Sequence, residues 1–144
     1  MEPKIYYKDV KFRLRKTKEI KNWIIQVIRS ENKEPGDLYF IFTPDNYMIE
    51  INREFLKRDY YTDVIAFDYS EENKINGEIY IGIETVKRNA KIYKTYFINE
   101  VVRVMLHGVL HLLGYDDKEE YERKKMKEME NLYMKEIAGQ KDGI

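Results

Sequence analysis

The apolar positions of this chain follow two periods, and the segments that carry them alternate along the sequence. Four short segments have the apolar run or alternation typical of strands: residues 5–7, 38–42, 62–67 and 78–83. Only a polar stretch, residues 70–76, separates the last two, so we expect them to pair as neighbours. Pro35-Gly36 is expected to break the chain before the second strand.

Helical spacing of apolar residues accounts for the remaining segments. One helix begins at Thr17, and a second follows Pro44, with Thr43 or Asp45 as its expected cap. Three more are expected over residues 84–94, from about 97 to 114, and over residues 118–138. The pattern predicts one α+β domain over residues 1–144, with a small mixed sheet of about four strands and five or six helices.

The composition fits a compact domain without covalent cross-links. The chain has 144 residues, of which 43% are hydrophobic, enough for a sizeable core. It has no cysteine, which excludes disulfides and thiolate metal sites and makes a reducing cytoplasm the default location. Neither a signal peptide nor an apolar stretch long enough to span a membrane is evident, so we expect a soluble protein.

Charge gives no global argument for a polyanionic partner, because 26 basic residues balance 26 acidic ones. Basic residues do cluster locally, within residues 11–18, at 57–58 and within residues 87–94. Each cluster is compatible with contacts to phosphates and equally with an ordinary solvated surface.

The two histidines of the chain stand four residues apart. On a helix, His107 and His111 lie on one face and can direct two imidazoles at one point, where a divalent metal is the natural occupant. Gly114 can end the helix in a left-handed conformation and return the chain, so that Asp117 becomes a third ligand in the pattern HxxxHxxGxxD. Asp116 is a competing ligand, or an acceptor for an imidazole N–H. The helix is apolar nearly all round and buried, so hydrogen-bonded core histidines are the alternative.

Three protein ligands indicate a catalytic metal, because structural zinc sites close all four positions. Imidazole and carboxylate suit one Zn²⁺ per chain with an open fourth position for water, and they also accept nickel, manganese or iron. Hydrolysis is the implied reaction class. Zinc peptidases with HExxH carry a glutamate base where Gly108 stands here, so phosphodiester hydrolysis is favoured over peptide hydrolysis.

Residues 107–116 resemble the signature of the YbeY family of bacterial rRNA-maturation endoribonucleases. Residues 51–55, 62–67 and 77–79 are similar to further stretches of that family. The resemblance implies a metal-dependent, zinc-bound endoribonuclease that cuts single-stranded RNA in 16S rRNA 3′-end processing and ribosome quality control. It also implies a small mixed sheet packed with helices, and partners among rRNA and ribosomal components.

Two positions depart from the family's pattern. The family usually has a third histidine where Asp117 stands, which preserves a liganding side chain. It also commonly carries an arginine after the aromatic residue that aligns with Phe55, where this chain has Leu56. Arg58 is then a nearby substitute for contacting phosphate or a solvated surface residue.

Several alternatives remain open. Thr62 and Asp63 form the rim of an active site or cap the start of a strand. The competing functions are a zincin-like metallopeptidase and a non-catalytic ribosome-assembly module with a structural metal. The oligomeric state is open as well.

Overall fold

Five helices and a four-stranded mixed sheet make up the computed structural model of the protein, which describes residues 2–57 and 62–137. The strands are β1 (Lys4–Tyr7), β2 (Glu34–Thr43), β3 (Val64–Asp68) and β4 (Lys74–Gly82). The helices are α1 (Thr17–Ser30), α2 (Asp45–Phe55), α3 (Ile83–Tyr93), α4 (Phe97–Leu112) and α5 (Glu120–Met134). The predicted α+β class is confirmed. None of the described helices is long and apolar enough to cross a bilayer.

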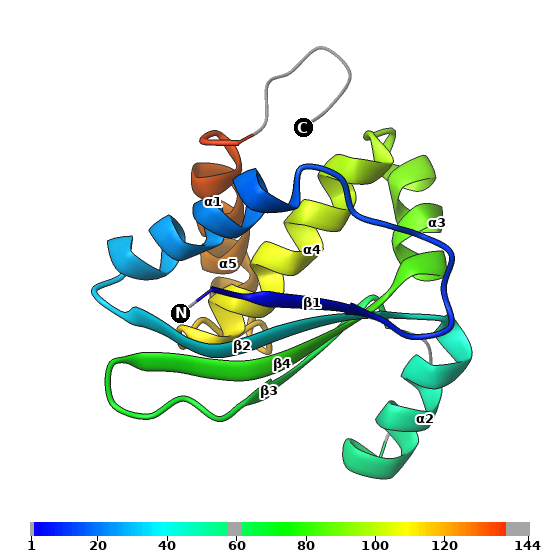
Figure 1. The fold of residues 1–144 in the computed structure, drawn as a ribbon, viewed down its shortest axis with the longest axis horizontal. Helices are drawn as coiled ribbons and strands as arrows, with labels where there is room; N and C mark the ends of the chain where they lie inside the picture. Colours follow the sequence, from blue (N-terminus) through cyan, green and yellow to red (C-terminus); the bar gives the residue numbers. More distant parts are fainter. Residues whose placement is uncertain (1, 58–61, 138–144) are drawn as a thin grey trace.

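The sheet has the order β1-β2-β4-β3, with β1 parallel to β2, β2 parallel to β4, and β3 antiparallel to β4. The predicted pairing of the last two strands is therefore confirmed. The helices α1, α4 and α5 lie above the sheet in Figure 1, and α2 lies below its right-hand end. The strand β3 is an edge strand, so one side of its backbone has no neighbouring strand in the described sheet.

The predicted break at Pro35-Gly36 is wrong, because β2 runs through both residues. The register against β4 shifts between Pro35 and Leu38, and this bulge accommodates the two residues inside the strand. The Asn76 side chain, from β4, accepts the backbone N–H of Asp37 at 2.7 Å, which satisfies a donor that the bulge removes from the ladder.

The predicted cap of the second helix is also wrong, because α2 has no side-chain cap at its N-cap, Pro44. The Asp45 carboxylate instead accepts the backbone N–H and the hydroxyl of Thr85, in the first turn of α3, and a 2.7 Å bond from Arg88. In return, the Glu84 carboxylate accepts the backbone N–H of Asp45 at 2.7 Å. Each helix therefore caps the other.

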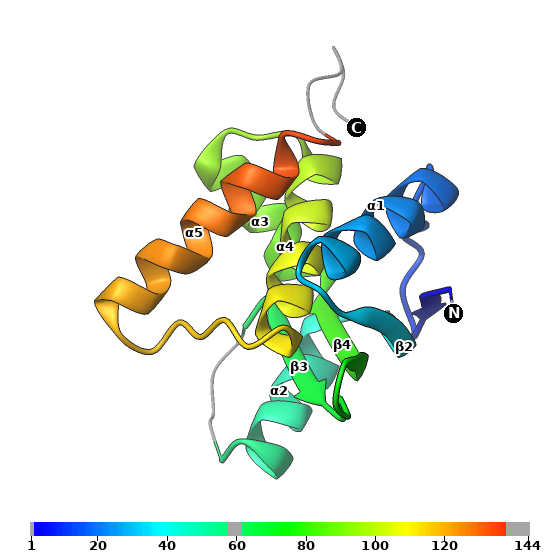
Figure 2. The same ribbon diagram turned by 90° about the vertical axis from the view of Figure 1, so that its left-hand side faces the viewer.

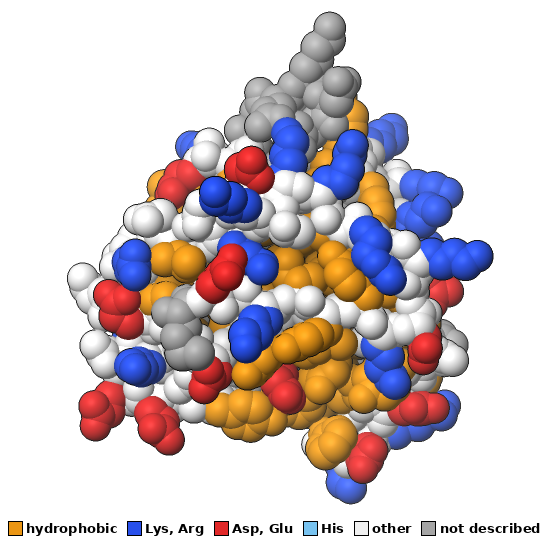
Figure 3. All heavy atoms as spheres, viewed as in Figure 1, with side chains coloured by type: hydrophobic (Ala, Val, Ile, Leu, Met, Phe, Trp, Pro, Cys, Tyr) orange, Lys and Arg blue, Asp and Glu red, His pale blue; other side chains and the backbone are white. Residues whose placement is uncertain are grey.

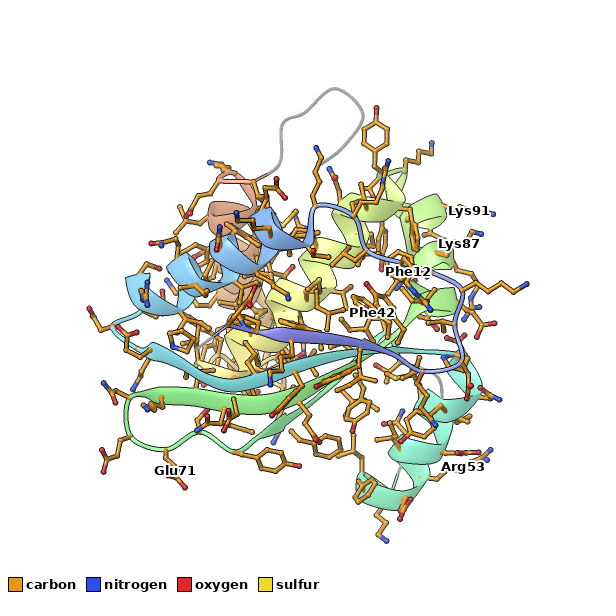
Figure 4. The ribbon with its side chains drawn as sticks, in the orientation of Figure 1. Phe12, Phe42, Arg53, Glu71, Lys87 and Lys91 are labelled. Carbon is orange, nitrogen blue, oxygen red and sulfur yellow. The ribbon has the colours of Figure 1, made fainter. Side chains whose placement is uncertain are left out.

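The helix α4 occupies the centre of the core, and ten of its sixteen residues are buried. It packs on β3 and β4 and is flanked by α1, α3 and α5 (Figures 1 and 2). The connection that precedes α1 closes one side of this core, where Phe12 meets Phe42 edge-on at 5.1 Å between ring centroids (Figure 4). The expectation of a buried histidine helix is confirmed.

The sheet face opposite α4 is partly open. The helix α2 covers one end of it, with Met48 and Ile51 packed on Ile65. Beyond α2, Tyr6 and Tyr39 stack on each other at 6.0 Å. Hydrophobic side chains gather in the lower half of Figure 3, below β1 and β2, where no helix covers the strands.

The last helix is shorter than predicted, because it begins with a capping box made by Glu119 and Glu122 and ends at Met134. Its apolar stripe is confirmed at Met126 and Tyr133, which are buried, whereas Leu132 is exposed. The stripe docks α5 on α4, and this contact positions side chains of α5 beside the two histidines.

A methyl group at Gly108 should destabilise the protein. An added Cβ would lie 2.6 Å from Cγ2 and 3.0 Å from Cδ1 of the fully buried Ile79. Overpacking of this kind costs about 1–3 kcal/mol, against about 1 kcal/mol that alanine gains over glycine in a helix. We therefore expect Gly108→Ala to lower the free energy of unfolding by up to about 2 kcal/mol in urea titrations.

An Ile79→Ala background provides the control, because it removes the atoms that the new methyl group would meet. The cost of Gly108→Ala should shrink in that background. An equal cost in both backgrounds, or a stabilised Gly108→Ala protein, would contradict the close approach of α4 to β4.

Candidate metal centre

Three side chains from the end of α4 and the following turn converge on one point. His107 Nε2 and His111 Nε2 lie 3.1 Å apart, and Asp117 Oδ2 lies 3.3 Å from each of them. The turn depends on Gly114, whose φ of 103° suits glycine and reverses the chain after the helix. The structure thus brings together all three side chains that the HxxxHxxGxxD pattern selected.

The spacing of these donor atoms suits a small divalent ion. Zinc binds imidazole nitrogen and carboxylate oxygen at about 2.0–2.1 Å, and a tetrahedron of that size has edges of about 3.3 Å. The three observed separations are close to this value. All three side chains are partly exposed, which leaves one side of the site accessible.

The second nitrogen of His107 is held by a carboxylate that the sequence analysis did not identify. The Nδ1 atom of His107 lies 2.6 Å from Oε2 of Glu130, a residue of α5. The other oxygen of Glu130 accepts a 3.0 Å bond from Arg103, one turn before His107 on α4. This arrangement directs Nε2 of His107 toward His111 and Asp117.

Nothing local in the sequence marks Glu130, because it is one of many acidic residues on a charged helix. The sequence also offered Asp116 as an acceptor for an imidazole N–H. For His107, that acceptor is Glu130. The Asp116 carboxylate instead accepts the backbone N–H of Asp117 at 3.3 Å, inside the turn that carries the third ligand candidate.

The two imidazoles hold protons with different strength. Burial lowers the pKa of His107. The hydrogen bond and charge of Glu130, together with the charges of Asp63 and Asp117, raise it by more, so the pKa of His107 lies above the usual value. Burial and the neighbouring His107 lower the pKa of His111 more than Asp117 raises it. In the metal-free protein His107 is therefore the imidazole that is protonated first as the pH falls.

Arg103 and His107 lower the pKa of the Glu130 carboxyl that both of them contact. Burial alone would raise the pKa of Glu130, but its bonds to His107 and Arg103 lower it below the usual range. Glu130 is therefore ionised at neutral pH, and it remains a fixed acceptor for His107.

The site opens into a cleft of about 380 Å³ that we call the β3 cleft. Its walls are residues 62–66 at and before β3, Asn52 and Leu56 of the α2 region, and the turn that carries Asp117 and Lys118. Because Lys118 lines this cleft, it supplies a cation that the sequence analysis did not select.

The other sequence candidates for phosphate contacts that the structure describes lie away from this cleft. Arg58 lies outside the described residues, so its predicted contact with phosphate stays a prediction. Lys87 and Lys91 point away from the body of the protein on the outer side of α3 (Figure 4). Within the described part of the chain, no member of the three basic clusters lines the β3 cleft.

Both interpretations of Thr62 and Asp63 have support. Thr62 donates a 3.5 Å bond to the carbonyl of Val64, as expected at the start of a strand. Asp63 accepts hydrogen bonds from its own backbone and that of Val64, yet its side chain also forms part of the cleft wall beside His107. Burial raises the pKa of Asp63, and His107 lowers it by less, so this carboxyl holds its proton more strongly than usual.

Comparisons with known proteins agree over nearly the whole chain. Residues 4–138 match the family model described as Endoribonuclease YbeY. A protein named Endoribonuclease YbeY from Flavobacterium psychrophilum is 45% identical over 127 residues, covering 88% of this chain and 91% of that protein. One of the same name from Amoebophilus asiaticus is 47% identical over 133 residues, covering 90% of each.

A solved structure shares the fold. The solution structure of TM1509 from Thermotoga maritima superposes with a TM-score of 0.62 at 28% sequence identity, covering 93% of this chain and 87% of that protein.

Removal of the Glu130 charge should weaken metal binding without unfolding the protein. Glu130→Gln replaces an ionised acceptor with a neutral amide, so His107 is less firmly oriented. Loss of such a partner typically costs about 10–100-fold in metal affinity. We expect this loss in zinc titrations against a competing chelator, whereas Glu128→Gln, an exposed change on the same helix, should bind zinc as the unmodified protein does.

Zinc binding near pH 6.5 should release about one proton per ion. The proton comes from His107, whose raised pKa keeps it charged there, whereas His111 is already neutral. Affinity should therefore fall as the pH falls through the pKa of His107. Calorimetry in two buffers of different ionisation enthalpy measures the proton count, and binding without proton release would contradict the assignment.

Proposed function

The chain belongs to the endoribonuclease YbeY family, and on that premise we propose that it is a metal-dependent endoribonuclease whose ion is held by His107, His111 and Asp117. It is a hydrolase that acts on phosphodiester bonds of single-stranded RNA. The observation that carries the proposal is the convergence of three donor atoms, 3.1–3.3 Å apart, at the end of an open cleft.

The donor set favours zinc, because two imidazoles and a carboxylate in a tetrahedral arrangement suit that ion, and other divalent transition metals fit the same ligand types. A bound ion of this kind supplies Lewis acidity toward a phosphoryl oxygen and lowers the pKa of bound water. The resemblance to the family extends the proposal to 16S rRNA 3′-end maturation and ribosome quality control in the cytoplasm, with residues 1–144 as one catalytic domain.

The side chains around the donors prepare them for this chemistry. Glu130, fixed by Arg103, keeps the Nδ1 proton of His107 in place and leaves Nε2 for the ion. Asp63 contributes a carboxyl to the wall of the β3 cleft, and its raised pKa brings its proton exchange closer to neutral pH. We assign Asp63 the proton-transfer role for which Gly108 has no side chain.

A peptidase is the second candidate, since HxxxH also occurs in zinc peptidases. It is disfavoured because α4 carries no acidic side chain directly after His107, and Gly108 at that position packs against Ile79. A Cβ there already meets the buried isoleucine, so this position has no room for a glutamate.

Zinc-loaded protein should cut single-stranded RNA and lose this activity on chelation. His111→Ala and Asp117→Ala should each lose the ion and the cleavage, since each removes one of three ligands. Asp116→Ala should keep the ion, because Asp116 serves the turn rather than the metal. Metal content by elemental analysis and product formation on labelled RNA measure the two effects separately.

Asp63→Asn tests the proton-transfer role in the same assay. We expect it to retain zinc and to lower the cleavage rate by about 10²–10⁴-fold. Cleavage that survives loss of the metal would contradict the proposal, as would cleavage of casein in place of RNA. Unfolding on chelation without any RNA cleavage would identify the metal as structural.

A further inference from the structure

A second cleft opens beside the candidate metal centre. It has a volume of about 690 Å³ and lies between α5 and the corner where α3 leads into α4, and we call it the α5 cleft. His107 and Asp117 line both this cleft and the β3 cleft. A smaller cavity of about 260 Å³ shares Asp63 with the β3 cleft, and Arg103 and Glu130 with the α5 cleft. The metal site is therefore a junction between two clefts.

Two exposed cations line the α5 cleft. Arg123 and Lys127 are exposed and stand four residues apart on α5, so they share one face of that helix. Arg123 is oriented by bonds from Nη1 to the carbonyls of Lys118, at 2.6 Å, and Asp117, at 3.4 Å. Lys127 has no ion pair or hydrogen bond among the described residues, so its ammonium group is available to a ligand.

Two of the three carboxylates that line the same cleft are held inward, and the third, Asp117, belongs to the candidate metal centre. Glu130 is bound to His107 and Arg103, so its charge is already compensated. Glu100 is buried, and burial raises the pKa of its carboxyl. A polyanion that approaches the cleft therefore meets two cations, and the carboxylate left exposed to it is that of Asp117, a ligand candidate of the metal centre.

The rim of the cleft also offers an aromatic surface. Tyr93, at the end of α3, is 62% exposed, and the buried Met126 lies among the lining residues of α5. An exposed aromatic ring beside cations is the combination with which proteins bind single-stranded nucleic acid, because every base has a face that can stack. The volume of the cleft also lies within the roughly 300–1,000 Å³ typical of small-molecule sites.

We propose that the α5 cleft is a nucleotide subsite, in which Arg123 and Lys127 contact the backbone phosphate and Tyr93 stacks on a base. The inference rests on the proposed endoribonuclease activity. A strand whose scissile phosphate lies at His107, His111 and Asp117 then occupies the β3 cleft on one side of the cut and the α5 cleft on the other. Substrate is recognised on both sides of the cleaved bond.

The test measures binding of zinc-loaded protein to a labelled, 2′-O-methylated single-stranded oligonucleotide of about 12 residues, long enough to fill both clefts. We expect Lys127→Glu to weaken binding about tenfold, and Lys127→Ala to reduce the salt dependence by about one phosphate contact. Tyr93→Ala should weaken binding at least about fivefold through loss of stacking. Arg123 is not used as the primary variant, because it also holds the turn that carries Asp117.

Matched controls change the same chemistry outside both clefts. Lys125→Glu makes the same charge reversal on α5, and Tyr121→Ala removes a ring that is 74% exposed. Both should bind the oligonucleotide within about twofold of the unmodified protein, and all variants should retain one zinc per chain. Equal losses in the variants and their controls would show an unspecific charge or surface effect and overturn the subsite.

Photo-cross-linking provides a readout that does not depend on affinity. A 4-thiouridine on one side of the cleavage site should cross-link to the segments around Tyr93 or Lys127, and one on the other side to residues 62–66. Cross-links confined to residues 62–66 from both sides would overturn the subsite while the activity stood. If the unmodified protein cut and bound no RNA at all, the proposed function would fail as well.

Discussion

The hydrogen bond between His107 and Glu130 couples the candidate metal centre to the rest of the molecule. Its two partners come from different helices, so the orientation of the imidazole depends on how α5 docks on α4. Docking in turn depends on buried residues of α5 such as Met126 and Tyr133. The geometry of the donors is therefore a property of helix packing and not of the local sequence around the histidines.

The local sequence nonetheless predicted much of the site. A pair of histidines at helical spacing, a glycine that tolerates positive φ and an aspartate three residues later are short-range features, and short-range geometry converts them directly into converging side chains. Element order and pairing of β3 with β4 were predictable for the same reason. The wrong expectations concern Pro35-Gly36, where a bulge keeps both residues in β2, and the cap of α2, where Glu84 of α3 accepts the backbone N–H of Asp45.

Glu130, Asp63 and the α5 cleft could not be predicted, because they depend on contacts between segments far apart in the chain. An acidic residue on a charged helix gives no sign of whether it faces solvent or an imidazole. Its environment is visible only in the fold, where Arg103 and His107 lie on either side of it and lower its pKa. The same burial that raises the pKa of Asp63 leaves that of Glu130 low, since only Glu130 has two cationic partners.

The Glu31 carboxylate, just after α1, accepts hydrogen bonds from the hydroxyls of Tyr115 and Tyr133, and so joins the beginning of the chain to its last helix. During synthesis on a ribosome, the N-terminal part of a domain emerges first. The nascent protein therefore has both histidines before it has Glu130 or the anchor at Tyr133. A chain that ended before α5 would therefore carry all three metal donors but neither the carboxylate that orients His107 nor the anchor at Tyr133.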